Sequence, residues 1–331
     1  MTQLFKFDFS KQRSKSPESK QQSVDNKESA QPITTPTMFS AKRPITTNIS
    51  SISSKLEMSD ELFNEYRQYI YKASGIYFTD AKKYLLEGRI ARRLAVNKLH
   101  TFEEYLQLLR SPNGRVEMNG LFEAITINET YFFRANQQFE ALEKIIIPET
   151  ISAKGNTFNP IYKIWVAASS TGEEAYTIAI IILEKLKNRY PQVQFQILAS
   201  DINNAVLEQA REGVYKEYAI RNVPPYLLKK YFRFDGTSYH LVDEVKRMVK
   251  FSNINLYDSQ QMRAVRGMDV IFCCNVLIYF DTTSKQQVVS YLYDSLNKNG
   301  YLFIGYSESL HGVSKAFHLI HLPKAMAYKK V

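Results

Sequence analysis

The sequence has few cysteines and no long apolar run, and each shortage excludes a class of protein. The only two cysteines, Cys273 and Cys274, are adjacent. Neighbouring residues on a strand point to opposite faces, which disfavours a structural disulfide, and two cysteines are too few for a typical zinc site. No apolar run reaches the ~20 residues of a membrane span, and the N-terminus lacks a signal-peptide pattern. We therefore expect a cytoplasmic, reduced protein with no metal and no membrane insertion.

The sequence also has fewer acidic than basic residues: 33 Asp and Glu against 43 Lys and Arg, which gives a net charge of +10. Residues 1–55 carry nine basic and four acidic side chains, which is half of the excess. Such a charge suits nucleic acid, an anionic membrane, an acidic protein partner, or simple solubility. The charge alone leaves these four explanations open.

Residues 1–55 are rich in Ser, Thr, Lys, Gln and Pro, and they have too few apolar residues to form a core. We predict a disordered tail. Its first residues, Leu4–Phe9, alternate apolar and charged side chains. They are either a short docking motif that folds on a partner or a tail end without function.

Residues 56–126 have the pattern of a small all-helical domain. Ser59 is a helix N-cap, followed by apolar residues at helical spacing, and Gly75 ends that helix. A second helix, capped at Thr79 or Asp80, is followed by a short third helix and a fourth that starts near Val116. The polar side of the second helix carries six basic residues, which we interpret as a surface for acidic partners. They are Lys82, Lys83, Arg89, Arg92, Arg93 and Lys98.

Residues 127–331 contain a strand, a turn of small residues and a helix start in Ile161–Leu183 (IYKIWVAASSTGEEAYTIAIIIL). A tight turn lets backbone N–H groups approach a ligand, and the following helix N-terminus adds partial positive charge. The pattern is neither a GxGxxG fingerprint nor a P-loop. On this stretch alone, a ligand site and an ordinary strand–helix turn are about equally supported.

The rest of the chain alternates strands and helices, which predicts a doubly wound, mainly parallel, Rossmann-like α/β sheet. A second strand ends at Asp201, where an acid is placed to hold the ribose hydroxyls of an adenosine. Residues 214–250 interrupt this rhythm, and we predict that they form a small inserted antiparallel β-subdomain. Polar residues follow several strands, at the sheet edge where such folds bind ligands. They are Ser170 to Glu174, Asp201, Asn255, Asn275 and Tyr279.

The sequence resembles the CheR family of chemotaxis receptor methyltransferases over roughly residues 59–330. Five motifs in one order carry the resemblance, and together they are far more specific than any single one. They are Thr126–Arg134 (TINETYFFR), Trp165–Tyr176 (WVAASSTGEEAY), Ala199–Asp201 with Ala210–Tyr215, Cys273–Asp281 (CCNVLIYFD) and Gly300–Ser309 (GYLFIGYSES).

The resemblance implies a helical N-terminal domain followed by a domain that binds S-adenosyl-L-methionine (SAM), with S-adenosyl-L-homocysteine (SAH) as product. It implies methylation of glutamate side chains on the cytoplasmic helices of chemoreceptors. The cofactor positions carried over from the family are Asn128, Thr130, Arg134, Glu174, Asp201, Asn255, Leu256, Cys274 and Asn275. Tyr279 matches the hydroxyl beside the transferred methyl group, and Arg134 and Tyr279 are the candidate catalytic residues. One departure is Cys274, because many members have arginine at this position.

None of the five histidines lies in a motif, which fits methylation of a carboxylate that is already ionised at neutral pH. We expect a monomer that recognises the receptor through the basic second helix. We expect the β-subdomain to be a docking surface, with a receptor tail as one candidate partner, rather than part of the cofactor site. A relative that binds cofactor or partner without catalysis remains an alternative. A nucleic-acid methyltransferase is supported only by the net charge, so we expect no nucleic-acid partner.

Overall fold

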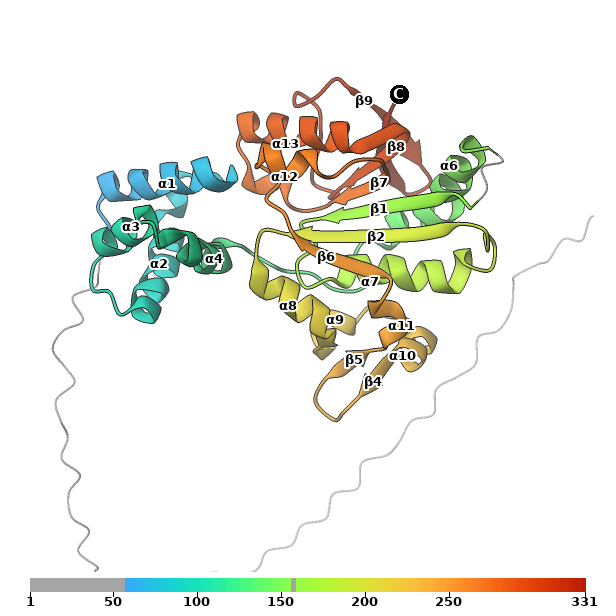
Figure 1. The fold of residues 1–331 in the computed structure, drawn as a ribbon, viewed down its shortest axis with the longest axis horizontal. Coiled ribbons are helices and arrows are strands. Elements are labelled where there is room, and N and C mark those ends of the chain that lie inside the picture. The colour runs from blue at the N-terminus through green and yellow to red at the C-terminus, as the bar shows by residue number, and fades with distance from the viewer. Residues whose placement is uncertain (1–56, 156–158) are drawn as a thin grey trace, which may run out of the picture. The chain divides into compact units, whose positions relative to one another are not determined.

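A computed structural model describes residues 57–155 and 159–331 of the chain. The tail predicted for residues 1–55 lies outside the described residues. Helices and strands follow one another in the order that the sequence pattern predicts: a helical part first, then alternating strands and helices (Figure 1).

The helical part begins with four α-helices and a short 3₁₀ turn. They are α1 (Asp60–Ser74), η1 (Asp80–Lys82), α2 (Lys83–Asn97), α3 (Phe102–Arg110) and α4 (Gly114–Ile125). The Ser59 hydroxyl caps α1 by accepting from the backbone N–H of Leu62, and Thr101 with Glu104 forms a capping box on α3. Apolar residues at helical spacing, among them Ile70 and Ile90, form one buried cluster, as the sequence predicts.

A second helical segment joins this part to the sheet, and the sequence analysis missed it. It consists of α5 (Asn136–Ala141), a π-helical turn η2 (Leu142–Ile146) and α6 (Ile147–Ala153). Its apolar residues Phe139, Leu142 and Ile146 are buried in the cluster that covers one face of the sheet. The helical spacing of these residues was the signal that could have revealed the segment.

The main sheet has seven strands in the order β6-β2-β1-β7-β8-β10-β9. The strands β6, β2, β1, β7 and β8 run parallel, whereas β10 is antiparallel to both β8 and β9. This confirms the mainly parallel, Rossmann-like sheet. The strands are β1 (Ile161–Ala167), β2 (Gln194–Asp201), β6 (Val249–Asn253), β7 (Met268–Cys273), β8 (Leu296–Ile304), β9 (Phe317–Leu322) and β10 (Ala325–Lys330).

Helices cover both faces of the sheet, so the central strands are buried on both sides. In β1, Ile164 and Val166 pack into one apolar cluster, and Trp165 and Ala167 pack into the other. This alternation is the two-residue period of a strand. The first cluster contains residues of α7 (Glu173–Ile181), and the second contains residues of α12 (Ser259–Arg263) and α13 (Thr282–Ser295) (Figure 1).

The helix α7 continues into the π-helical turn η3 (Ile182–Leu186), and α8 (Asn204–Glu212) follows β2. The inserted subdomain has a three-stranded antiparallel sheet in the order β3-β5-β4, as predicted. Its elements are β3 (Val214–Tyr215), α9 (Glu217–Ile220), α10 (Pro225–Tyr231), β4 (Phe232–Phe234), β5 (Tyr239–Leu241) and α11 (Asp243–Lys246).

One strand boundary differs from the sequence expectation. The Asn299–Gly300 pair in the sequence predicts a turn before a strand that starts at Tyr301, but β8 already begins at Leu296 and passes through these residues. Asn299 has a φ of 63°, and the β7–β8 register shifts between Met268 and Val270. The pairing advances two residues along β7 and five along β8, so β8 contains an irregularity that the Asn-Gly pair alone could not distinguish from a hairpin turn.

Gly172, which precedes α7, provides a test of the turn after β1. Its φ is +91°, and an added Cβ would lie 3.0 Å from the Cβ of Ala210 and 3.1 Å from the ring of Phe251. We expect Gly172→Ala to lower the free energy of unfolding by about 1–3 kcal/mol, because the backbone conformation is strained for any residue with a Cβ.

The matched control is Gly88→Ala, since an added Cβ at this helical position meets nothing within 4 Å. Removing glycine from a helix interior stabilises by up to ~1 kcal/mol. Thermal or urea denaturation of both variants measures the difference. Equal stability of the two variants would contradict the strained turn.

Candidate active site

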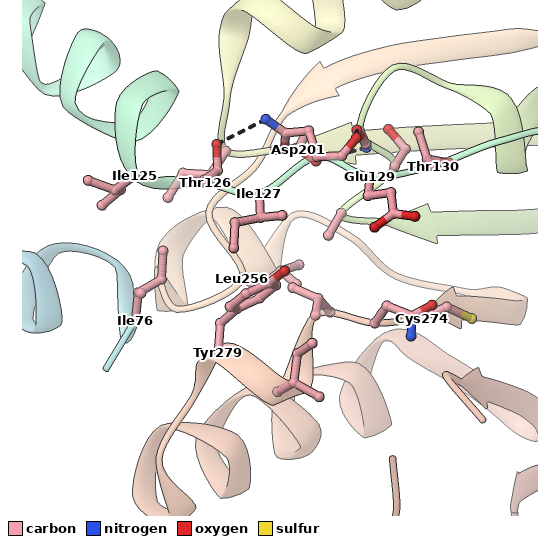
Figure 2. A pocket seen from close by; sticks show the side chains of 18 of the residues that line it. Ile76, Ile125, Thr126, Ile127, Glu129, Thr130, Asp201, Leu256, Cys274 and Tyr279 are labelled. Atoms are coloured by element: carbon pink, nitrogen blue, oxygen red, sulfur yellow. Dashed lines mark hydrogen bonds between the residues drawn. The ribbon is translucent and has the colours of Figure 1, made fainter. Parts of the chain in front are cut away.

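A cavity of about 320 Å³ lies at the carboxyl ends of the parallel strands. This volume is at the lower end of the range of ~300–1,000 Å³ for small-molecule sites. All ten residues that the family resemblance assigns to the cofactor or to catalysis line this one cavity: Asn128, Thr130, Arg134, Glu174, Asp201, Asn255, Leu256, Cys274, Asn275 and Tyr279. Figure 2 shows that they come from separate segments, including the loop before α5, the end of β2 and the segment around Tyr279.

The turn between β1 and α7 forms one wall of the cavity. Ala168, Ser170 and Gly172 all have positive φ, with values of 59°, 49° and 91°. Such alternation turns backbone N–H groups toward one side and is found at anion and ligand sites. The buried hydroxyl of Ser169, which also lines the cavity, has no hydrogen-bond partner among the described residues. This hydroxyl is free to bond a polar ligand.

Asp201, at the end of β2, fixes the same turn from the neighbouring strand. Its Oδ2 accepts from the backbone N–H of Ser170 (2.9 Å), and its Oδ1 accepts from that of Asn203 (3.0 Å). Burial raises the pKa of Asp201, while these backbone donors act in the opposite direction. A carboxylate has about four lone-pair positions, so both oxygens can still accept bonds from a ligand.

The loop 126–134 crosses the carboxyl ends of β1 and β2. Ser170 Oγ donates to the backbone oxygen of Asn128 (3.1 Å), and Asn203 Nδ2 donates to Thr126 Oγ1 (2.9 Å). Thr126 Oγ1 also accepts from Asn128 Nδ2 (3.2 Å), the bond drawn at Thr126 in Figure 2. Farther along, Phe133 has a φ of 57°, and its N–H donates to Thr177 Oγ1 (3.1 Å). The loop is therefore tied to both sides of the β1–α7 turn.

Glu174 provides a second carboxyl group in the cavity, and its environment is unusual. Burial raises its pKa to about 7, although the nearby Cys274 thiol and Arg134 guanidinium lower it. The Cys274 thiol points toward Gln138 Oε1 at 3.7 Å, and burial with the neighbouring Glu174 raises the pKa of this thiol well above its usual range. Among the described residues, no cation forms an ion pair with Glu174.

The segment that carries Asn275 and Tyr279 is held by Glu308, a residue that the sequence analysis did not select. The Glu308 carboxylate accepts from the N–H groups of Asn275 (2.9 Å), Gly305 (2.7 Å) and Ile278 (3.2 Å). Asn275 itself has a φ of 60°. The sequence contained a signal for a role of Glu308, because it is the only acid in the Gly300–Ser309 motif.

The helical part contributes directly to the cavity. The N–H of Tyr77 donates to the backbone oxygen of Tyr279 (2.9 Å), and Asn255 Nδ2 donates to the backbone oxygen of Ala73 (2.7 Å). The side chains of Lys82 and Arg89 also line the cavity. Burial raises the pKa of Tyr279, whereas the positive charges of Arg89 and Arg134 lower it.

The predicted basic surface of α2 needs a correction, because its six residues do not share one solvent-exposed face. Arg89 is only 9% exposed and donates to the backbone oxygen of Ile125. Arg93 makes a two-bond ion pair with Glu117, at 2.8 Å for each bond, and Lys83 pairs with Asp60 at 2.6 Å. Lys82, Arg92 and Lys98 are exposed. Helical spacing alone could not predict which cations had acids opposite them on α1 and α4.

The arrangement suits a ligand with an adenosine and an amino-acid end. Asp201, Glu174 and Ser169 can accept hydrogen bonds from hydroxyl and ammonium groups, and Ile254 and Leu256 provide apolar wall. Arg134 lines the cavity, and its Nη1 donates to the backbone oxygen of Glu129 (2.7 Å). The other N–H groups of this guanidinium can bind a carboxylate. The described residues contain no cluster of acids, histidines and cysteines that could hold a metal ion. None of their helices is both long and apolar enough to span a membrane.

Comparison with known proteins identifies the family to which the chain belongs. Residues 61–126 match the family model "CheR methyltransferase, all-alpha domain", and residues 128–326 match "CheR methyltransferase, SAM binding domain". The chain is 34% identical over 278 residues to chemotaxis protein methyltransferase 2 of Vibrio cholerae, covering 83% of this chain and 95% of that protein. It is 33% identical over 267 residues to the chemotaxis protein methyltransferase of Borreliella burgdorferi, covering 80% and 94%. With its SAM-binding domain, the chain belongs to the CheR methyltransferase family.

Proposed function

We propose that this protein transfers the methyl group of SAM to glutamate carboxylates of chemotaxis receptors, giving glutamyl methyl esters. The observation that carries the proposal is the division of one cavity into two parts. Hydrogen-bond acceptors for a cofactor, Asp201 and Glu174, lie in the sheet domain, and Arg89 lies with Tyr279 on the side of the helical part. A cationic side with a phenol is suited to an incoming carboxylate.

For the cofactor, we assign Asp201 to the ribose hydroxyls and Glu174 to the ammonium group of the methionine end. Asn128 and Thr130 come from the loop over the cavity, Asn255 and Leu256 from the segment after β6, and Cys274 and Asn275 from the end of β7. The Asn255 side chain is committed to Ala73, so we expect it to shape the wall rather than to bond the cofactor.

Methyl transfer from a sulfonium to a carboxylate is an in-line displacement: the carboxylate oxygen forms the new C–O bond as the S–CH₃ bond breaks. The sulfur keeps the electron pair and leaves as a neutral thioether. A glutamate with a pKa of ~4.3 is already ionised, so no general base is needed. Alignment of two reactants can supply ~7–11 kcal/mol, and this is the role we assign to Arg134 and Tyr279.

For the receptor, we revise the recognition surface to the cations of η1 and α2 that face the cavity or its surroundings. Lys82 and Arg89 line the cavity, and the charge of Arg92 acts on Arg89. These three charges are placed to attract a helix that carries glutamates. A relative that binds SAM without catalysis remains the alternative, because Cys274 replaces an arginine common in the family. A methyl-transfer assay on receptor fragments decides between them.

Asp201→Ala tests the cofactor assignment. We expect it to weaken SAH binding by ~1–3 kcal/mol, because a charge-assisted hydrogen bond to the ribose is lost. Isothermal titration calorimetry measures the change, and Asp294→Ala, at an exposed position of α13, is the control. Wild-type affinity in a folded Asp201→Ala protein would exclude this residue from the site.

The raised pKa of Glu174 predicts a pH dependence of cofactor affinity. With a pKa of about 7 in the free protein, Glu174 must lose a proton before it can pair with the ammonium group. The affinity for SAH should therefore rise as the pH increases from 6 through 7 and level off above about 8. In Glu174→Gln this rise should disappear, although the affinity is lower throughout. Parallel pH profiles of the two proteins would contradict the assignment.

Recognition of the receptor predicts that the double variant Lys82→Glu, Arg92→Glu loses kcat/KM for receptor methylation. We expect a loss of about tenfold or more at low salt that narrows as salt rises, because the Debye length is only ~8 Å at physiological ionic strength. SAH affinity should stay within about twofold of wild type. The control is Lys98→Glu, an exposed change at the C-terminal end of α2. Equal activity of all three proteins at low salt would show that these cations only face solvent.

A further inference from the structure

The inserted subdomain supports the cofactor cavity from outside. None of its residues from 214 to 250 lines the cavity, in keeping with the expectation that it is not part of the cofactor site. Its first residues nevertheless hold two cavity walls. The hydroxyl of Tyr215 donates to the backbone oxygen of Thr171 (2.8 Å), and the backbone oxygen of Ala219 accepts from the N–H of Phe132 (2.9 Å).

A cluster of aromatic and charged side chains strengthens the second of these contacts. The Arg221 guanidinium carbon lies 3.3 Å from the centre of the Tyr131 ring and 3.6 Å from that of the Tyr218 ring, so the cation is held between two aromatic faces. The Tyr218 hydroxyl donates to Glu129 Oε1 (2.9 Å). We call Tyr218 and Arg221, together with Glu129 and Tyr131, the loop clamp.

The clamp is next to the residues assigned to the cofactor. Glu129 and Tyr131 line the cavity and flank Thr130 in the loop. The Arg134 guanidinium donates to the backbone oxygen of Glu129 (2.7 Å) and lies 5.6 Å from the Tyr131 ring. Tyr218 and Arg221 of the inserted subdomain therefore contact Glu129 and Tyr131 of the loop. Glu129 and Tyr131 in turn contact Arg134.

The buried side of the same loop is already fixed by packing. Phe132 makes edge-on contacts with Tyr215 (4.9 Å between ring centres) and Phe232 (5.1 Å). These contacts anchor Phe132 in the core, whereas the exposed side chain of Glu129 is held from the subdomain by Tyr218. The clamp thus acts on the residues that face the cavity, and the aromatic core acts on the residue that faces away from it.

We propose that Tyr218 and Arg221 are positioning residues that hold the loop 128–134 over the cofactor and thereby set the affinity for SAM. The proposal rests on the proposed function, because it takes this loop as the cover of the cofactor. Neither residue touches the cavity, so each acts through Glu129 and Tyr131. The inserted subdomain thus acts on cofactor binding in addition to any docking role.

The test compares SAH affinity by calorimetry in Arg221→Ala, Arg221→Lys, Tyr218→Phe and wild type. We expect about three- to tenfold weaker binding for Arg221→Ala, because a cation between two aromatic rings is lost. Arg221→Lys keeps a cation and should recover part of the affinity. Tyr218→Phe keeps the ring but loses the bond to Glu129, and we expect about a two- to fivefold loss. Arg233→Ala, which removes an exposed arginine of β4 in the same subdomain, should bind as wild type does.

Two further readouts separate positioning from general destabilisation. Amide hydrogen exchange in residues 129–133 of the unliganded protein should speed up in Arg221→Ala and stay unchanged in Arg233→Ala. In methyl-transfer assays, KM for SAM should rise more than kcat falls. Wild-type SAH affinity in Arg221→Ala overturns the proposal. If the wild-type protein itself fails to bind SAH, the proposed function is contradicted. In that case, amide hydrogen exchange in residues 129–133 that is unchanged in Arg221→Ala overturns the loop clamp as well.

Discussion

The parallel pairing of β1 with β2 is the constraint on which the site depends. Its register places Ala167 beside Ser200, so the turn that starts at Ala168 faces the carboxylate of Asp201. The bond from the Ser170 N–H to Asp201 then fixes a backbone with three positive φ values within five residues. Strain of this kind persists only where the surroundings hold it in place, and the buried strands on both sides do so.

Hydrogen bonds connect other walls of the cavity to this turn or to one another. The loop over the cavity is tied to the turn by Ser170 and Asn128, and the inserted subdomain is tied to it by Tyr215. On the opposite side, Glu308 holds the segment of Tyr279, and the chain after α1 pairs with it through Ile76 and Phe280. The helical part is therefore a structural component of the cavity.

Sequence reasoning predicted the sheet and placed the candidate site residues at one of its edges, because strand alternation and the polar residues at strand ends can be recognised from local spacing. It also predicted the antiparallel insertion. It missed what depends on contacts between distant segments: the role of Glu308, the acids opposite Arg93 and Lys83, and the contact of Arg221 with Tyr131. A charged residue on a predicted helix cannot be assigned to solvent or to a partner before the neighbouring helix is placed.

We propose that the cavity places a SAM methyl group against a receptor glutamate. The most direct measurement is transfer of tritiated methyl from SAM to membranes that contain chemoreceptors, followed by mild base treatment. We expect label on the receptor that base releases as methanol, since a glutamyl methyl ester hydrolyses readily, and little label when Tyr279 is replaced by phenylalanine. Tight SAH binding by a protein that labels no receptor, or label that resists base, would contradict it.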